Sequence, residues 1–146
     1  MKARPIDPPR WYWLAAGLAL LWMLFGVAAL AMDVMMDESA LAQLSEGQRQ
    51  LYGERPAWLF GVYALAIASG LAGAIALLLR RAWAVPALVL SLASVALQFG
   101  YTFGVMDAIA RLGGAAAALP FPLTIIMAGV LVLWLALHAR RRGWLA

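Results

Sequence analysis

The sequence has 146 residues, of which 66% are hydrophobic and 12% are charged, about half the charged share of a typical soluble domain. Most of its surface is therefore expected to face something other than water. It has no cysteine, which excludes disulfides, iron–sulfur clusters and thiolate metal sites. The net charge is +4, but the basic residues lie in short clusters between apolar runs, so nucleic acid is not an expected partner.

Four apolar runs without Asp, Glu, Lys or Arg follow one another along the chain, at residues 11–32, 57–79, 82–103 and 119–138. A helix needs ~20 residues to cross ~30 Å of hydrocarbon. We therefore predict an all-α membrane protein, a single integral membrane domain over residues 1–146 built as a transmembrane four-helix bundle. A lipid bilayer is its expected surroundings.

The first run could also be a cleaved signal peptide. Basic residues precede it, and Ala29-Leu30-Ala31 resembles a small-x-small cleavage site. The run is longer than the ~7–15 residues of a signal-peptide apolar region, so we expect an uncleaved anchor.

The direction of the spans is predicted by three basic clusters, which precede the first run, join the second to the third, and follow the fourth. They are Lys2, Arg4 and Arg10; Arg80 and Arg81; Arg140, Arg141 and Arg142. An even number of crossings puts all three on one side, and lysine and arginine near span ends favour the cytoplasm. Both termini are predicted to be cytoplasmic. The other two loops are acidic and should face the periplasm or the exterior.

The first run ends in AMDVMMDES, residues 31–39, which combines three methionines with two aspartates. Thioether sulfur favours soft Cu(I) and carboxylates favour harder ions, so the mixture is not a coherent ligand set. We predict that Met32, Met35 and Met36 pack or form a flexible hydrophobic mouth, with a metal role as a minor alternative. Asp33 is expected at the headgroup level.

The first external segment, residues 37–55, has apolar residues at near-helical spacing. We predict a short amphipathic helix, started by Asp37 or Ser39 and serving as a connector or a lid. In the second external loop, Asp107 and Arg111 would pair if the third helix continued through them. Gly113-Gly114 offers a helix stop, and the LPFP segment at 119–122 should begin the last span.

The second span carries a stripe of small residues that lets a neighbouring helix approach closely. Its members are Ala66, Gly70, Gly73 and Ala74, with Ser69 alongside. We predict a helix-packing surface.

The third span places four polar residues at i, i+3, i+7 and i+10, hence on one face: Ser91, Ser94, Gln98 and Tyr101. Polar groups in hydrocarbon need partners, so this face should point into the bundle. It would either fix packing through hydrogen bonds or line a ligand path at Gln98 and Tyr101.

On the first span Trp22, Gly26, Ala29 and Asp33 share a face by the same arithmetic. The small residues leave room beside Trp22. A ligand-binding crevice between the first and third spans is therefore predicted, with Trp22, Gly26, Asp33, Gln98 and Tyr101 as its candidate residues.

The sequence has few of the residues and motifs that catalysis or cofactor binding requires. His138 is the only histidine and Lys2 the only lysine, so a Ser-His-Asp triad, a bis-histidine heme site or an intramembrane Schiff base is not expected. Neither phosphate-cradling pattern, GxxxxGK[ST] or GxGxxG, occurs. We predict a protein that is not an enzyme and carries no cofactor.

Five segments together resemble a bacterial family of small four-span inner-membrane proteins, whose members are often labelled sugar transporters. The segments are PPRWYW, LWMLFG, LYGERPAW, LLLRRAWAVP and QFGYTF. The resemblance implies residence in the bacterial inner membrane and points to Trp22, Gly26, Gln98 and Tyr101 as positions to test. Met23 stands where members of that family tend to have a polar residue.

Two functions remain open. The protein is a small-solute transporter or ligand-binding membrane protein that uses the predicted crevice, or it is an accessory subunit that packs against a larger complex through Ala66, Gly70 and Ala74. If it transports, a homo-oligomer is expected, because four spans are few for an alternating-access transporter; as an accessory protein it would be a subunit of a membrane complex.

Overall fold

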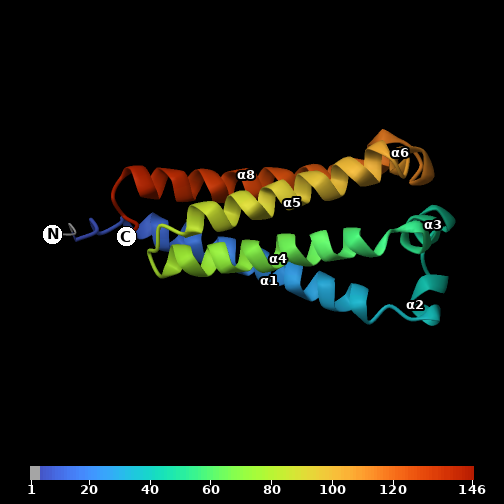
Figure 1. Ribbon diagram of the computed structural model, residues 1–146, viewed down its shortest axis with the longest axis horizontal. Coiled ribbons are helices and arrows are strands. Elements are labelled where there is room, and N and C mark those ends of the chain that lie inside the picture. Colours follow the sequence, from blue (N-terminus) through green and yellow to red (C-terminus); the bar gives the residue numbers. More distant parts are fainter. Residues whose placement is uncertain (1–3) are drawn as a thin grey trace.

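Four long helices run side by side in an elongated bundle (Figure 1). They are α1 (Arg10–Val34), α4 (Ala57–Leu78), α5 (Ala84–Gly104) and α8 (Pro120–Arg141). Each is long and apolar enough to cross a membrane. The four predicted spans are confirmed, and their ends differ from the prediction by three residues or fewer. The structure, a computed structural model, describes residues 4–146; Lys2 of the first basic cluster lies outside the described residues.

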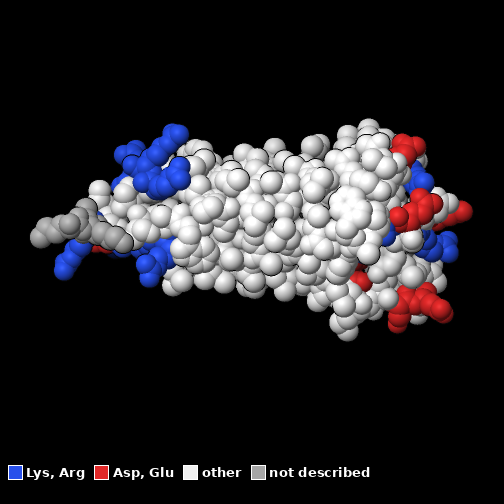
Figure 2. Space-filling model, viewed as in Figure 1, with Lys and Arg blue, Asp and Glu red and all other residues white. Residues whose placement is uncertain are grey.

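Charge separates the two ends of the bundle. Both chain ends of the described segment and most of the arginines lie at one end, here called the basic end, and most acidic side chains lie at the other, the acidic end (Figures 1 and 2). On the face shown, the surface between the two ends is uncharged (Figure 2). This distribution is typical of a membrane-spanning bundle.

Four short helices cover the acidic end: α2 (Glu38–Ala42), α3 (Glu46–Glu54), α6 (Ala108–Arg111) and α7 (Ala115–Ala118). The single amphipathic helix predicted for residues 37–55 is therefore two helices. Asp37 caps α2 by accepting a hydrogen bond from the Ala40 amide at 2.8 Å, as expected. Ser45 then forms a capping box with Gln48, which starts a new helix and breaks the first.

The tightly packed core lies at the basic end. Tyr12 is completely buried, and its hydroxyl donates a hydrogen bond of 2.5 Å to the backbone oxygen of Leu77. The Trp144 ring packs edge-on against Tyr12 with ring centroids 5.6 Å apart. Around them, small and branched side chains of all four long helices form one buried cluster. This end therefore holds the four helices together.

The small-residue stripe of α4 is buried inside the bundle. Ala66, Gly70, Gly73 and Ala74 are all buried. A Cβ added to Gly73 would stand 2.6 Å from Leu88 Cγ on α5, and one added to Gly70 would stand 2.8 Å from the Ser91 hydroxyl. Glycine is needed at these positions because the neighbouring helix comes so close.

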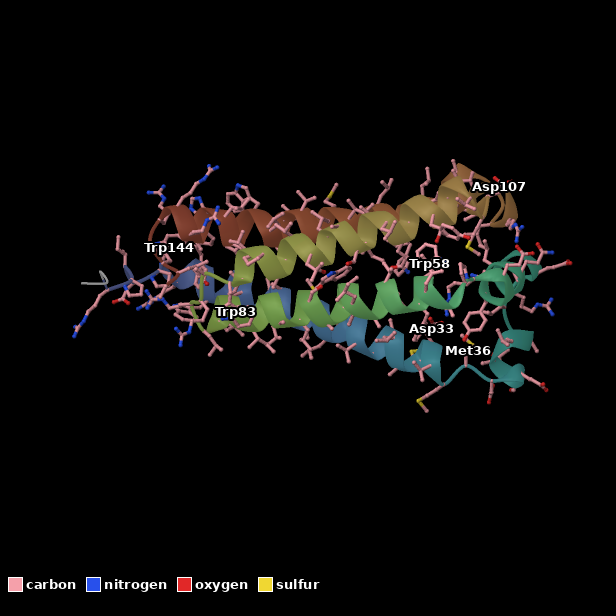
Figure 3. All side chains as sticks on the ribbon, in the orientation of Figure 1. Asp33, Met36, Trp58, Trp83, Asp107 and Trp144 are labelled. Carbon is pink, nitrogen blue, oxygen red and sulfur yellow. The ribbon has the colours of Figure 1, made fainter. Side chains whose placement is uncertain are left out.

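Outward-facing side chains of the long helices are large and apolar, as hydrocarbon requires. Leu18, Leu131 and Trp134 are among those with more than half of their surface exposed. Trp83 and Trp144 lie near the basic end and Trp58 near the acidic end (Figure 3). Tryptophans at both ends match the aromatic belts expected at the two membrane interfaces.

The predicted pairing of Asp107 with Arg111 is wrong. Helix α5 ends at Gly104, and Asp107 adopts a left-handed backbone conformation with φ 53°. The two residues are therefore not on one continuous helix. Arg111 instead forms an ion pair with Glu54 on α3. Gly113 and Gly114 have positive φ and end α6, and Pro120 begins α8, as predicted.

Candidate functional site

A cavity of about 540 Å³ lies between the four long helices, mostly in the half nearer the acidic end. We call it the crevice. Its volume falls within the ~300–1,000 Å³ range of small-molecule sites. All four long helices contribute to its walls, whereas the predicted site involved only the first and third spans.

Helix α1 forms one wall with the face that the sequence predicts. Trp22, Gly26, Ala29 and Asp33 all line the crevice. Gly26 leaves room for a side chain, because a Cβ placed there would meet only Ile67, at 3.7 Å. The crevice is wide at this point because glycine has no side chain.

Helix α5 forms the opposite wall through Ser91, Val95 and Gln98. Ser91 donates a hydrogen bond of 2.7 Å to the Ala66 backbone oxygen of α4, so its hydroxyl is already used in packing. Ser94 likewise donates to its own helix, at the Leu90 oxygen. Gln98 is thus the α5 side chain best placed to offer polar groups to a ligand.

Tyr101 does not line the crevice. Its ring lies edge-on against Trp58 of α4, with ring centroids 4.9 Å apart. Trp58 lies near the acidic end (Figure 3), so the two aromatic rings pack α5 against α4 there. Of the five candidate residues, the structure brings four together and leaves Tyr101 in a packing position.

The crevice is open on the side between α1 and α8. These helices meet at the basic end, where Trp11 lies against His138, and diverge toward the acidic end (Figure 1). Phe25 of α1 and Phe121 of α8 both line the crevice, yet 64% and 72% of their surfaces are exposed. In a membrane, a ligand could therefore reach the crevice sideways, from the hydrocarbon.

An ion pair lies at the acidic end of the crevice. Arg55, just before α4, donates from Nη1 to the Oδ2 of Asp33 at 2.9 Å, and both side chains are largely covered. The Arg55 guanidinium also lies 4.9 Å from the Tyr52 ring centroid and 5.3 Å from that of Phe60. Tyr52 donates a hydrogen bond to the Asp33 backbone oxygen at 3.0 Å. These contacts tie the end of α3 to the end of α1.

Sequence reasoning missed Arg55 and Tyr63 as crevice residues. Arg55 could have been found from its position in the sequence. It directly precedes the second span, so it lies at the same membrane level as Asp33, at the end of the first. Tyr63 lies three residues before Ala66 and seven before Gly70, which puts it on the inward face of α4.

The methionine cluster lies beside the crevice and not in it. Met32 and Met35 are 72% and 78% exposed, and Met36 is partly covered. Among residues 4–146 there is no group of three or more His, Asp or Glu side chains that could hold a metal ion.

Comparison of the chain with protein-family models, with curated proteins and with solved structures finds no match. The function is therefore argued from the chemistry of the crevice.

Proposed function

We propose that this protein is a multi-pass protein of the bacterial inner membrane that binds and transports a small, largely apolar solute through the crevice. The observation that carries this proposal is the lining itself. Apolar side chains of four helices surround a volume of about 540 Å³, and the charged groups, Asp33 and Arg55, gather at one end.

The lining favours an apolar solute with one polar group over a sugar. A sugar presents many hydroxyls, each of which loses free energy if buried without a partner. The crevice offers few free partners, since the Ser91 hydroxyl is bonded to Ala66 and Arg55 occupies one oxygen of the Asp33 carboxylate. Gln98, Tyr63 and the indole N–H of Trp22 are the remaining polar groups of the wall.

The basic end is proposed to face the cytoplasm, following the preference of arginine and lysine for that side. The acidic end with α2 and α3 then faces the periplasm. In this orientation the charged end of the crevice lies at the outer interface, and its lateral opening lies in the outer half of the bilayer.

Transport by alternating access generally requires two repeats that move against each other. One copy has four long helices, so we propose a homo-oligomer as the working unit. Helix α1 has three buried residues whereas α4 has eight, which leaves α1 as the helix with most surface for a second copy.

The accessory-subunit hypothesis requires the small-residue stripe of α4 to be accessible to a partner protein, and it is not. Ala66, Gly70 and Ala74 face the inside of the bundle, where Gly70 lies against Met23 and Ser91. That face is not accessible to a partner protein. No other feature of the described residues favours this function over the crevice.

The proposal is tested with triphenylphosphine oxide, a neutral molecule with three apolar rings and one polar oxygen. Protein in lipid nanodiscs is dialysed against the probe, with empty nanodiscs as the blank. Saturable binding is expected for the wild-type protein. The variant Gly26→Leu places a side chain in the crevice and should weaken binding by about tenfold or more, the effect of ~1.4 kcal/mol.

The matched control is Gly17→Leu, on the same helix, where a Cβ meets nothing within 4 Å. This variant should bind as the wild-type protein does. Equal affinities of the Gly26→Leu and Gly17→Leu proteins, or no saturable binding to either, would contradict the proposed site.

A further inference from the structure

Five of the nineteen residues that line the crevice are aromatic. Trp22 and Phe25 come from α1, Tyr63 from α4, Phe99 from α5 and Phe121 from α8. The face of an aromatic ring carries negative charge density and attracts organic cations. Each of the four long helices therefore brings at least one ring that a cation in the crevice can contact.

The charges at the end of the crevice also favour a cation. Asp33 and Arg55 are the charged residues of the lining and balance each other, whereas the two external loops that include them contain six acidic and three basic residues, a net charge of −3. This net negative charge raises the local concentration of cations at the acidic end and lowers that of anions.

Arg55 shows that this place already stabilises an organic cation. Its guanidinium contacts the Asp33 carboxylate and lies over two aromatic rings, those of Tyr52 and Phe60. The ion pair uses Oδ2 of Asp33, and the negative charge of a carboxylate is shared with its second oxygen. A ligand cation can thus bind Asp33 together with Arg55, or it can displace Arg55 from Asp33. In the second case Arg55 keeps its contacts with the two aromatic rings.

We propose that the solute of the crevice is a lipophilic organic cation, held by the aromatic wall and by the carboxylate of Asp33. This inference rests on the proposed function of the crevice and names its ligand class. Such a cation dissolves in the membrane interface and reaches the site through the opening between α1 and α8. Arg55 acts as the internal cation with which the ligand competes.

The experiment compares three probes of similar shape and different charge on the full chain in nanodiscs of neutral lipid. Tetraphenylphosphonium is the cation, triphenylphosphine oxide the neutral molecule and tetraphenylborate the anion. The cation is expected to bind about tenfold or more tightly than the other two, after subtraction of empty nanodiscs, a difference of ~1.4 kcal/mol.

Variants of Asp33 and Arg55 test whether these two residues cause the preference for the cation. Asp33→Asn should remove most of the preference for the cation, Asp33→Glu should retain it, and Arg55→Gln should tighten binding of the cation several-fold by removing its competitor. The double variant Asp33→Asn with Arg55→Gln leaves no unpaired charge among the residues that line the crevice, and it should lose the preference as Asp33→Asn does. This variant keeps the test valid if Asp33→Asn alone folds poorly.

Each outcome separates this inference from the proposed function. If the neutral probe binds as tightly as the cation and Gly26→Leu weakens both, the crevice binds ligands and the cation inference is wrong. If Arg55→Gln leaves the affinity for the cation unchanged and Asp33→Asn does too, Asp33 is not the cation site. If Gly26→Leu affects no probe, both proposals fail.

Discussion

Tyr12 is the residue that most directly links α1 to the rest of the bundle. Its ring is completely buried at the basic end, and a hydroxyl in apolar surroundings needs a partner. The Leu77 backbone oxygen provides it, close to the end of α4. The same oxygen also accepts a hydrogen bond from the Arg80 amide at 3.1 Å, so it stays satisfied if the hydroxyl is removed.

We therefore predict that Tyr12→Phe lowers the free energy of unfolding by about 0.5–1.5 kcal/mol, the net value of one hydrogen bond without an orphaned acceptor. The measurement is denaturant-induced unfolding in detergent micelles. Tyr101→Phe is the control, because the contact of its ring with Trp58 is retained. Equal losses in the two variants would mean that the Tyr12 bond contributes no stability of its own.

The spacing of residues along α1 predicts the position of Asp33 but not its ion-pair partner. Its place eleven residues after Trp22 predicts the face on which it lies, and the structure puts it on the crevice. Its partner Arg55 is 22 positions along the chain. That pairing depends on how residues 35–54 turn back over the end of the bundle, which no local periodicity encodes.

Among the elements, α4 is the central helix, because it packs closely on α5 along its small-residue stripe and contacts α1 on another side. Gly73 is the tightest point of the stripe, with Leu88 Cγ 2.6 Å from the position of an added Cβ. Leu88 is itself buried in the core. The two helices would have to separate to admit a larger side chain.

We predict that Gly73→Leu destabilises the protein by about 1–3 kcal/mol or more, as overpacking of a dense core does. Thermal unfolding in detergent measures the effect. Gly61→Leu is the matched control on the same helix, since a Cβ at Gly61 meets nothing within 4 Å and the position is exposed. A melting temperature of the Gly73→Leu protein at or above that of Gly61→Leu would show that α4 and α5 pack less closely than described.

The short helices α2 and α3 show the limit of amphipathic patterns for such elements. Apolar spacing over residues 37–55 predicts one helix, but Ser45 and Gln48 satisfy the first amides of a second helix through a capping box. The break lets α3 turn back toward the crevice, where Tyr52 reaches α1 and Glu54 pairs with Arg111.

For the whole molecule, the two ends differ in how firmly they are held. At the basic end, Arg80 joins three segments: its side chain donates to the backbone oxygens of Ile6 and Trp144 and forms an ion pair of 3.1 Å with Asp7. The acidic end has the crevice and short helices in place of such a core. Motion that opens a ligand path is therefore expected at the acidic end.

The proposed orientation can be tested with single cysteines, because the chain has none. Gln43→Cys lies at the acidic end and Arg142→Cys at the basic end, and both positions are exposed. In intact bacteria whose outer membrane has been made permeable, a maleimide that cannot cross the inner membrane should label Gln43→Cys only. After the inner membrane is lysed, both should be labelled, which controls for reactivity. Labelling of Arg142→Cys alone in intact cells would reverse the orientation.

By itself the sequence determined the four helices and the separation of charge between their ends. Both follow from local chemistry: uninterrupted apolar runs of a length that spans hydrocarbon, and basic residues gathered at alternate connections. The face shared by Trp22, Gly26 and Asp33 follows as well, because a helix repeats every 3.6 residues.

Only the tertiary structure decided which groups meet. It joined Arg55 to Asp33 and Arg111 to Glu54, moved Tyr101 from the predicted site to a packing contact with Trp58, and added α4 and α8 to the crevice wall. Each of these depends on the rotation and depth of one helix against another. Those are set by contacts among all the helices at once, such as the close approach at Gly70 and Gly73, and not by the pattern within any single span.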